Sequence, residues 1–254
     1  MQIAVLVKSI PDPYGVPKLD DQHLVDRAGE GNLDPGDEYA VEAGLKIAEA
    51  HGGEVALVTM GPENASAAIR KGLSMGAHSA GHVSDPSLRG ADVLATARVL
   101  AAALKRSPFD LVIAGVESTD GSTGTLPMAV AELLGVPSLT FARAVEIDGD
   151  RVRVERITDL GYDVIESPMP ALVTVTGSAA EPRYPTLKGI MAAKSKPVET
   201  LGFSDLGIPS DDVTPAQRVE AVTPAAEKGA GEVIQAGDDA AKRIADLLAE
   251  AKVI

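Results

Sequence analysis

Residues 115–125 have the clearest potential to bind an anion. They are rich in glycine, serine and threonine and follow the apolar run 111–115. Gly121 and Gly124 would let the backbone approach an anion closely, while Ser122, Thr123 and Thr125 each offer a hydroxyl donor. A helix beginning here would add free N–H groups at the positive end of its dipole. A phosphate suits this set of donors, although serine and threonine residues that only cap a helix give the same pattern.

Two further loops follow apolar runs and should meet the first loop. Residues 8–14 come after the run 3–7, and residues 61–64 come after the run 55–60. In an open α/β sheet the ligand crevice lies at the carboxyl ends of the strands. The three loops would then surround a crevice the size of an adenine nucleotide. Leu6 and Met60 would be its apolar walls, or plain core residues.

Residues 181–197 form a basic segment in an acidic chain. Its cations are Arg183, Lys188, Lys194 and Lys196, and Glu181 is its only acid. Leu187, Ile190 and Met191 lie among these cations, between prolines. An exposed apolar anchor ringed by charge suits transient docking to a partner protein. The alternative is a short surface helix with its apolar side folded down.

Several chemistries lack their motifs. Neither GxxxxGK[ST] nor GxGxxG occurs, so the lysine and magnesium-binding hydroxyl of a nucleotide hydrolase are missing. No GxSxG elbow occurs, and we assign no catalytic residue. His78 and His82 are four residues apart, but Gly76 and Gly81 argue against a shared helical face, so we expect no metal site. With no cysteine, any redox role needs a borrowed cofactor.

The elements that must position these loops follow a strand-then-helix order. Short unalternating apolar runs at 3–7, 55–60 and 111–115 predict buried parallel strands. Helical spacing predicts helices at 38–49, 64–74, 90–105 and 123–134. Residues 142–147 and 152–157 flank Asp148-Gly149-Asp150, which predicts a β-hairpin, and 171–176 predicts another strand. The fold class is therefore α/β, a doubly wound, mostly parallel sheet with a β-hairpin and a C-terminal extension arm.

The expected division is an α/β nucleotide-binding domain over residues 1–200 and an arm over 201–254. From Leu201 onward the chain becomes acidic and loop-rich, before a helical pattern at 238–252. That helix carries an apolar face that could pack on its own domain or on another subunit. The face consists of Ala241, Ile244, Ala245, Leu248 and Ala251.

Composition limits the partners. The 254 residues include 37 acidic and 23 basic side chains, a formal net charge of −14. Nucleic acid and anionic membranes would be repelled over most of such a surface. The longest N-terminal apolar run ends at Lys8, too short for a signal peptide or a membrane span, so we expect a cytoplasmic protein with no membrane insertion.

Three blocks of sequence make the chain similar to the β subunit of electron transfer flavoprotein. They are VLVKSIPD, AGVESTDGSTG and, above all, EPRYPTLKGIMAAKSKP, with PALVT and DLGI as further matches. The resemblance implies a heterodimer with a larger α subunit that holds most of the FAD. It also implies electron transport in fatty acid oxidation, from acyl-CoA and related dehydrogenases to a membrane quinone oxidoreductase. The chain would be a carrier component and not an enzyme.

The resemblance also assigns residues to sites. It implies a structural AMP in the crevice, Tyr14 near the FAD, and residues 183–197 as the partner-recognition loop, with Leu187 as its anchor and Lys194 as a candidate for modification. The arm's helix would pack on the partner subunit. The implied AMP contacts are Leu6, Asp34, Met60, Gly115, Glu117, Ser118, Asp120, Gly121, Ser122, Thr123, Gly124 and Thr125. The implied partner contacts are Pro185, Leu187, Ile190 and Met191.

Two other functions remain as alternatives. One is a bifurcating flavoprotein subunit, in which a second FAD replaces AMP and the complex reacts with NADH. The short hydroxyl-rich turn at 122–124 disfavours it. The other is an adenine-nucleotide-binding signalling module without a flavin partner, which leaves the basic segment unexplained.

Overall fold

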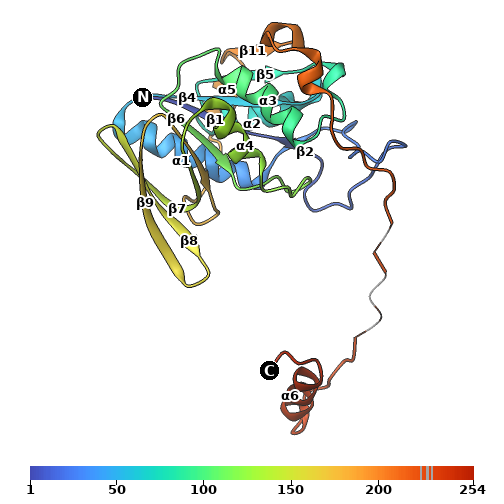
Figure 1. Ribbon diagram of the computed structural model, residues 1–254. Helices are drawn as coiled ribbons and strands as arrows, with labels where there is room; N and C mark the ends of the chain where they lie inside the picture. Colours follow the sequence, from blue (N-terminus) through green and yellow to red (C-terminus); the bar gives the residue numbers. More distant parts are fainter. Residues whose placement is uncertain (224, 227–228, 230) are drawn as a thin grey trace. The chain divides into compact units, whose positions relative to one another are not determined.

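This computed structural model describes residues 1–223, 225–226, 229 and 231–254. The chain divides into two units, Met1–Glu220 and Ala221–Ile254. The first contains a sheet with helices on both sides, and the described residues of the second include the helix α6 (Figure 1).

The first unit is built on a nine-stranded sheet with the order β11-β5-β4-β1-β6-β10-β7-β8-β9. All neighbours from β11 to β7 pair in parallel, and β7, β8 and β9 pair antiparallel. This confirms the predicted fold class. The strands are β1 (Gln2–Leu6), β4 (Glu54–Met60), β5 (Ser79–Val83), β6 (Leu111–Gly115), β7 (Ser138–Asp148), β8 (Arg151–Thr158), β9 (Gly161–Pro168), β10 (Ala171–Val175) and β11 (Val198–Leu201).

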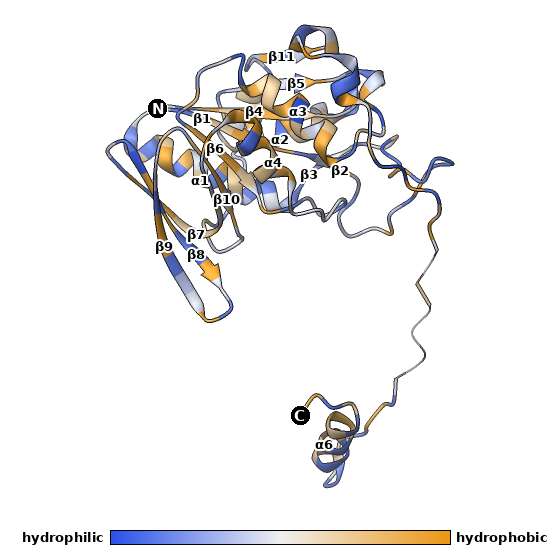
Figure 2. Cartoon of the chain, viewed as in Figure 1, coloured by the Kyte–Doolittle hydropathy of each residue, from blue (hydrophilic) through white to orange (hydrophobic). Residues whose placement is uncertain are grey.

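The helices bury both faces of the parallel strands, which is why those strands are apolar without alternation. Ile3 and Val5 of β1 face α1, α2 and α5, whereas Ala4 and Leu6 face α3 and α4. Figure 2 shows the resulting apolar centre. The helices are α1 (Pro35–His51), α2 (Ser66–Met75), α3 (Val93–Leu104), α4 (Leu126–Leu134) and α5 (Leu187–Ala193).

Local signals explain where the helices begin and end. Asp34 caps α1 by accepting a hydrogen bond from the Gly36 N–H, and Pro35 occupies the first turn. α4 ends at Gly135, whose positive φ of 71° permits the left-handed cap. α4 begins at Leu126 and not at the predicted residue 123, so residues 123–125 belong to the preceding loop.

The antiparallel extension is longer than predicted. The hairpin of β7 and β8 turns through Gly149 and Asp150, as the Asp-Gly signal indicated. β9, the edge strand, was not predicted, because Asp163 and Glu166 break its apolar pattern. β5 and β11 were not predicted either, because they are short and contain small or polar residues.

Two smaller features complete the first unit. β2 (Ser9–Ile10) and β3 (Asn32–Leu33) form a separate two-stranded sheet. The 3-10 helices span Glu63–Ala65, Pro86–Leu88, Phe203–Leu206 and Ser210–Val213. Phe203, Leu206 and Val213 pack against a small core around Val83 and Leu88. The compact unit therefore runs to Glu220, beyond the expected boundary at residue 200, because these apolar side chains pack against it.

The second unit contains α6 (Ala240–Glu250), inside the predicted helix 238–252. Its Ile244 and Leu248 side chains are both exposed. Packing of this face on a partner subunit stays a prediction.

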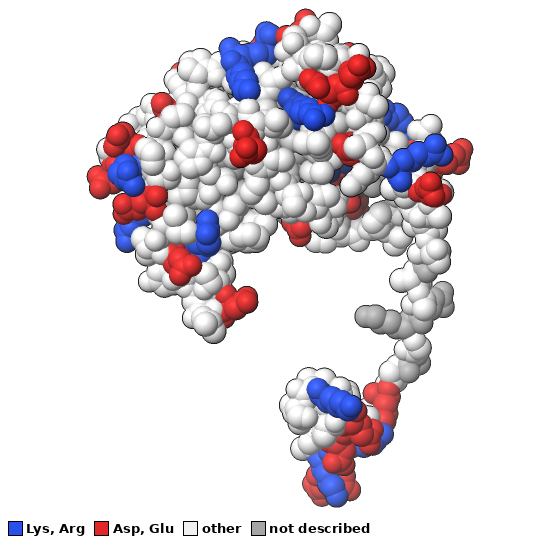
Figure 3. Space-filling view, in the orientation of Figure 1, with Lys and Arg blue, Asp and Glu red and all other residues white. Residues whose placement is uncertain are grey.

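Among the described residues, no helix combines the length and apolarity needed to cross a membrane. The part of the chain that the structure describes also contains no cluster of three potential metal-ligating side chains. Cationic and anionic side chains are interspersed on the face drawn in Figure 3.

Candidate functional site

The loop after β6 folds back on itself at the carboxyl edge of the sheet. The Ser118 carbonyl accepts hydrogen bonds from the Gly121 N–H (3.2 Å) and the Ser122 N–H (2.8 Å). Ser122 and Gly124 have positive φ values of 45° and 61°. A Cβ atom at Gly121 would lie 2.8 Å from Ser118 Oγ and 3.3 Å from Lys8 Nζ, so only glycine fits there without a shift. The loop is therefore narrow and has its backbone close to a cation.

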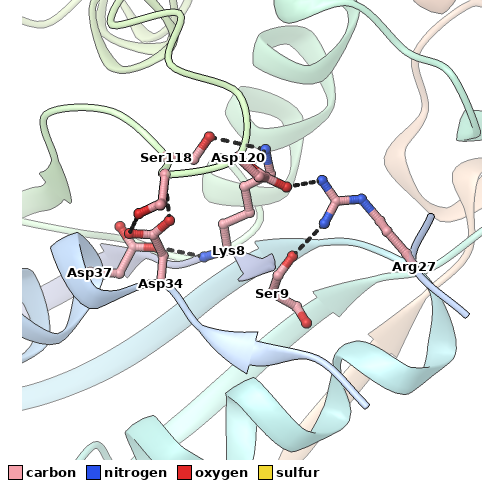
Figure 4. A network of polar contacts seen from close by, with 8 residues as sticks. Lys8, Ser9, Arg27, Asp34, Asp37, Ser118 and Asp120 are labelled. Carbon is pink, nitrogen blue, oxygen red and sulfur yellow. Dashed lines mark hydrogen bonds and ion pairs between the residues drawn. The ribbon is translucent and has the colours of Figure 1, made fainter. Parts of the chain in front are cut away.

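A charged cluster joins this loop to the loop after β1. We call Lys8, Arg27, Ser118 and Asp120 the edge cluster (Figure 4). Lys8 Nζ lies 2.7 Å from Asp120 Oδ1 and 3.0 Å from Ser118 Oγ. Arg27 forms an ion pair with the other Asp120 oxygen and donates to the Ser9 carbonyl at 2.7 Å. The carboxylate of Asp120 thus balances two cations at the mouth of the predicted crevice.

The electrostatics of Asp120 follow from this arrangement. Burial raises the pKa of its carboxyl, but the ammonium of Lys8 and the guanidinium of Arg27 outweigh burial, so its pKa lies below the usual value. Asp120 is consequently an anion at neutral pH.

Two buried aspartates at the start of α1 accept hydrogen bonds from the loops after β6 and β1. Asp34 Oδ2 accepts from the Thr119 N–H at 2.7 Å, and Asp34 Oδ1 accepts from the Gly36 N–H at 2.8 Å. Asp37 accepts from the Lys8 N–H at 2.7 Å. Burial raises the pKa of Asp37 well above its usual value, and the nearby Asp34 adds to the rise. Asp34 therefore fixes the loop after β6, and Asp37 fixes the loop after β1.

The loop after β4 joins the same edge. Asn64 Nδ2 donates to the carbonyls of Arg27 and Gly29, both at 2.6 Å. The three loops that the sequence placed at one edge therefore meet there, joined through Lys8 and Arg27. Lys8, Arg27 and Asp37 were not predicted as site residues.

The remaining predicted crevice residues divide into wall and rim. Leu6 and Met60 end β1 and β4, and both pack into the apolar layer under α3 and α4. The hydroxyls of Ser122, Thr123 and Thr125 are exposed, and none has a hydrogen-bond partner among the described residues. Glu117 is also exposed, and Gly115 is buried against Asp37 and Gly36.

The basic segment carries an outward apolar surface on α5. We call Leu187, Ile190 and Met191 the apolar trio; they are 77%, 46% and 59% exposed. Ala193 is the buried residue of α5, packed into the main core. Pro185, before the helix, is half-buried. The apolar side of α5 is thus not folded down in this chain.

Only part of the positive charge of the segment faces solvent. Lys188 and Lys194 are exposed, whereas Arg183 contacts Glu42 and Glu49, and Lys196 donates to backbone carbonyls. The sequence pattern indicated the basic segment but not that two of its cations are used inside the domain.

Tyr14 lies apart from these features, in a turn held by Asp12. The Tyr14 N–H donates to Asp12 Oδ1 at 3.0 Å, and the ring is 92% exposed. None of the described residues covers this ring, so it is accessible to another molecule.

Two grooves lie at the other edge of the sheet. One, of about 700 Å³, runs between the end of α1 and the hairpin, lined by Lys46, His51 and Arg153 among others. The other, of about 530 Å³, is lined by Met1, Asp110 and Pro170, near the amino ends of three parallel strands. Both are shallow, and neither contains a predicted site residue.

Comparison with known proteins identifies the family. Residues 22–206 match the family model described as "Electron transfer flavoprotein domain". "Electron transfer flavoprotein subunit beta" of Mycobacterium tuberculosis is 42% identical over 99% of both chains. Proteins of the same name from Thermoanaerobacterium thermosaccharolyticum and Bacillus subtilis are 36% and 35% identical, over 92% and 100% of both chains. The chain therefore belongs to the electron transfer flavoprotein family, as a β subunit.

Proposed function

We propose that this chain is the β subunit of a heterodimeric one-electron carrier in the cytoplasm. Its donors are acyl-CoA and related dehydrogenases, and its acceptor is a membrane quinone oxidoreductase. Similarity to curated β subunits along 99% of the chain carries the proposal. In this role the chain positions its partners and catalyses no reaction by itself.

The crevice at residues 115–125 is proposed to hold the phosphate of AMP. The donors suit an anion: the exposed hydroxyls of Ser122, Thr123 and Thr125, and the backbone N–H groups in the first turn of α4, whose N-cap Thr125 makes no capping hydrogen bond. Because Asp120 already balances Lys8 and Arg27, these neutral donors and not the cations would make most of the phosphate contacts. Leu6, Met60 and Glu117 would line the rest of the nucleotide.

Asp34 is proposed to act on the nucleotide indirectly. Both of its oxygens accept hydrogen bonds from the chain itself, from Gly36 and Thr119. The carboxylate is fully buried. Asp34 would therefore stabilise the conformation of the loop at residues 115–125 without contacting the nucleotide itself.

FAD is proposed to be held mainly by the α subunit, with Tyr14 of this chain beside it. When bound, the flavin supplies the redox chemistry. The exposed Tyr14 ring, in a turn fixed by Asp12, supports this placement because it can cover a flavin without rearrangement.

Docking to the dehydrogenase is proposed to occur through the apolar trio and Pro185. Leu187 is its most exposed member and would enter a pocket on the donor as an anchor. Lys188 and Lys194 flank this surface and would meet acidic groups around that pocket.

Nucleotide content tests the proposal directly. The chain is purified together with its α subunit, the nucleotides are released with acid, and FAD and AMP are counted per heterodimer. One FAD and one AMP are expected. Two FAD and no AMP would replace the proposal with the bifurcating, NADH-reactive subunit, and absence of flavin would overturn the carrier function.

A further inference from the structure

The docking segment is fastened to the domain at its first cation. Arg183 Nε lies 2.7 Å from Glu42 Oε2, and Nη2 lies 3.0 Å from Glu42 Oε1. The same guanidinium reaches Glu49, with Nη1 2.6 Å from Oε1. Arg183 thus bridges two carboxylates that lie about two turns apart on one face of α1, with a bidentate contact that fixes the plane of its guanidinium.

Burial makes this contact specific. The Glu42 side chain is 3% exposed, whereas Glu49 is mostly exposed. A buried carboxylate needs a charged partner, because removing that partner leaves an uncompensated charge in a medium of low polarity. The hydrogen bonds that Arg183 donates to the carboxylates of Glu49 and Glu42 raise the pKa of its guanidinium. Among the described residues, the hydrogen bonds and the ion pair of the Glu42 carboxylate all come from Arg183.

The segment is fastened again at its last cation. Lys196 Nζ donates to the Leu73 carbonyl at 2.9 Å and to the Ala77 carbonyl at 2.6 Å. Leu73 is in the last turn of α2, where free carbonyls and the helix dipole both favour a cation. The ammonium group of Lys196 therefore attaches the C-terminal end of the segment to the C-terminal end of α2.

α5 itself touches α2 between these two points. A Cβ atom at Gly189 would lie 2.4 Å from the Ser74 carbonyl oxygen, so the two backbones are in direct contact. α5 has seven residues, which is too short for a helix to be stable alone in water. Its orientation, and with it the outward direction of the apolar trio, depends on its attachments to α1 and α2.

We propose that Arg183 and Lys196 are positioning residues that hold the apolar trio in its docking geometry before a dehydrogenase arrives. This inference rests on the proposed docking function. A segment held in one conformation loses little freedom on binding, whereas a released segment binds only in the fraction of molecules that have the correct geometry. If release leaves one tenth of the molecules competent, the apparent affinity falls tenfold. The rate within the formed complex should stay the same, because both side chains are engaged with groups of their own domain.

The experiment uses the flavin-loaded heterodimer as electron acceptor for the acyl-CoA dehydrogenase that reduces the wild-type complex fastest. Arg183→Gln and Lys196→Met are each expected to raise the KM for the heterodimer about tenfold, with kcat and flavin content unchanged. Hydrogen exchange of the amides in α5 should accelerate in both variants. Arg183→Lys keeps the positive charge but loses the bidentate guanidinium contact, so its KM should lie between those of wild type and Arg183→Gln.

Three further variants make the outcome decisive. Arg183→Gln leaves the buried carboxylate of Glu42 without its charged partner, and this single variant could fail to fold. The double variant Arg183→Gln with Glu42→Gln removes both charges and allows a neutral hydrogen bond between the two side chains. Arg153→Gln is the matched control, since Arg153 also bridges two glutamates, Glu146 and Glu166, but on the hairpin. It should leave KM unchanged. Leu187→Ala tests the docking function on its own.

The outcomes separate the two claims. If Leu187→Ala raises KM but Arg183→Gln, its double variant and Lys196→Met all behave as wild type, the positioning role is overturned and docking stands. If Leu187→Ala also leaves KM unchanged, the docking function itself fails. In addition, Leu187→Ala should have a smaller effect in the Arg183 and Glu42 double variant than in wild type, because a misplaced anchor contributes less.

Discussion

Replacing Leu187 by alanine should weaken docking and leave the fold intact. The side chain is 77% exposed, so little apolar contact within the domain is lost. Complete burial of a leucine side chain contributes about 1.5–3 kcal/mol. Because most of this side chain is still exposed to water, we expect alanine to reduce the free energy of docking by about 1–2 kcal/mol, which corresponds to a rise in KM of about 5- to 30-fold.

The assay is steady-state reduction of the heterodimer's flavin by an acyl-CoA dehydrogenase, with the heterodimer as varied substrate. Leu160 offers a matched control: it is a fully exposed leucine in the turn between β8 and β9. Leu160→Ala should leave KM unchanged. Both variants should unfold within about 0.5 kcal/mol of wild type, as expected for exposed positions.

An unchanged KM for Leu187→Ala would refute the argument that exposed apolar area on α5 is buried on docking. An equal rise in KM for Leu160→Ala would refute the assignment of docking to α5, because the effect would then not be specific to Leu187. A large loss of stability in Leu187→Ala would contradict the exposure from which the magnitude was worked out.

Three further predictions concern the stability of the domain. Burial and Asp34 raise the pKa of Asp37, so the folded chain binds a proton that the unfolded chain releases, and stability should decline as pH rises from about 4 toward the folded pKa. Asp37→Asn should remove that decline in urea unfolding between pH 4 and 8, and parallel curves for the two proteins would contradict it. Gly189→Ala brings a methyl group onto the Ser74 carbonyl and should destabilise the domain by about 1–3 kcal/mol in the same assay; a change near zero would show that α5 moves away freely. The buried hydroxyl of Thr59 has no partner among the described residues, so Thr59→Val should stabilise by about 1 kcal/mol, or about 2–4 °C in thermal unfolding, and a lower melting temperature would count against it.

The sequence predicted the strands that consist of continuous apolar residues. The runs at 3–7, 55–60 and 111–115 became β1, β4 and β6, since helices cover both of their faces. β5 and β11 were missed because pairing with neighbouring strands, and not an apolar run, makes them strands: β11 is mostly exposed, and β5 contains Gly81 and His82. His82 is buried, with Nε2 3.1 Å from the Gly61 carbonyl, an environment that its sequence neighbours do not indicate.

The site was predictable where it is local. The glycine and hydroxyl loop and the outward trio each lie within one short segment, and the sequence indicated both. The edge cluster joins Lys8 to Asp120 across 112 positions, and the contact between Arg183 and Glu42 spans 141 positions. No periodic pattern encodes such pairs, because the order of strands in the sheet brings them together.

The inward use of Arg183 and Lys196 also shapes how the carrier meets its donors. With these cations paired inside the domain, only Lys188 and Lys194 extend a field from α5 into solvent. At physiological ionic strength such a field is screened within about 8 Å. Encounters should therefore depend on diffusion and on the fit of a small apolar surface, with little long-range steering. If docking occurs as proposed, such a surface would suit several donors whose surface charges differ.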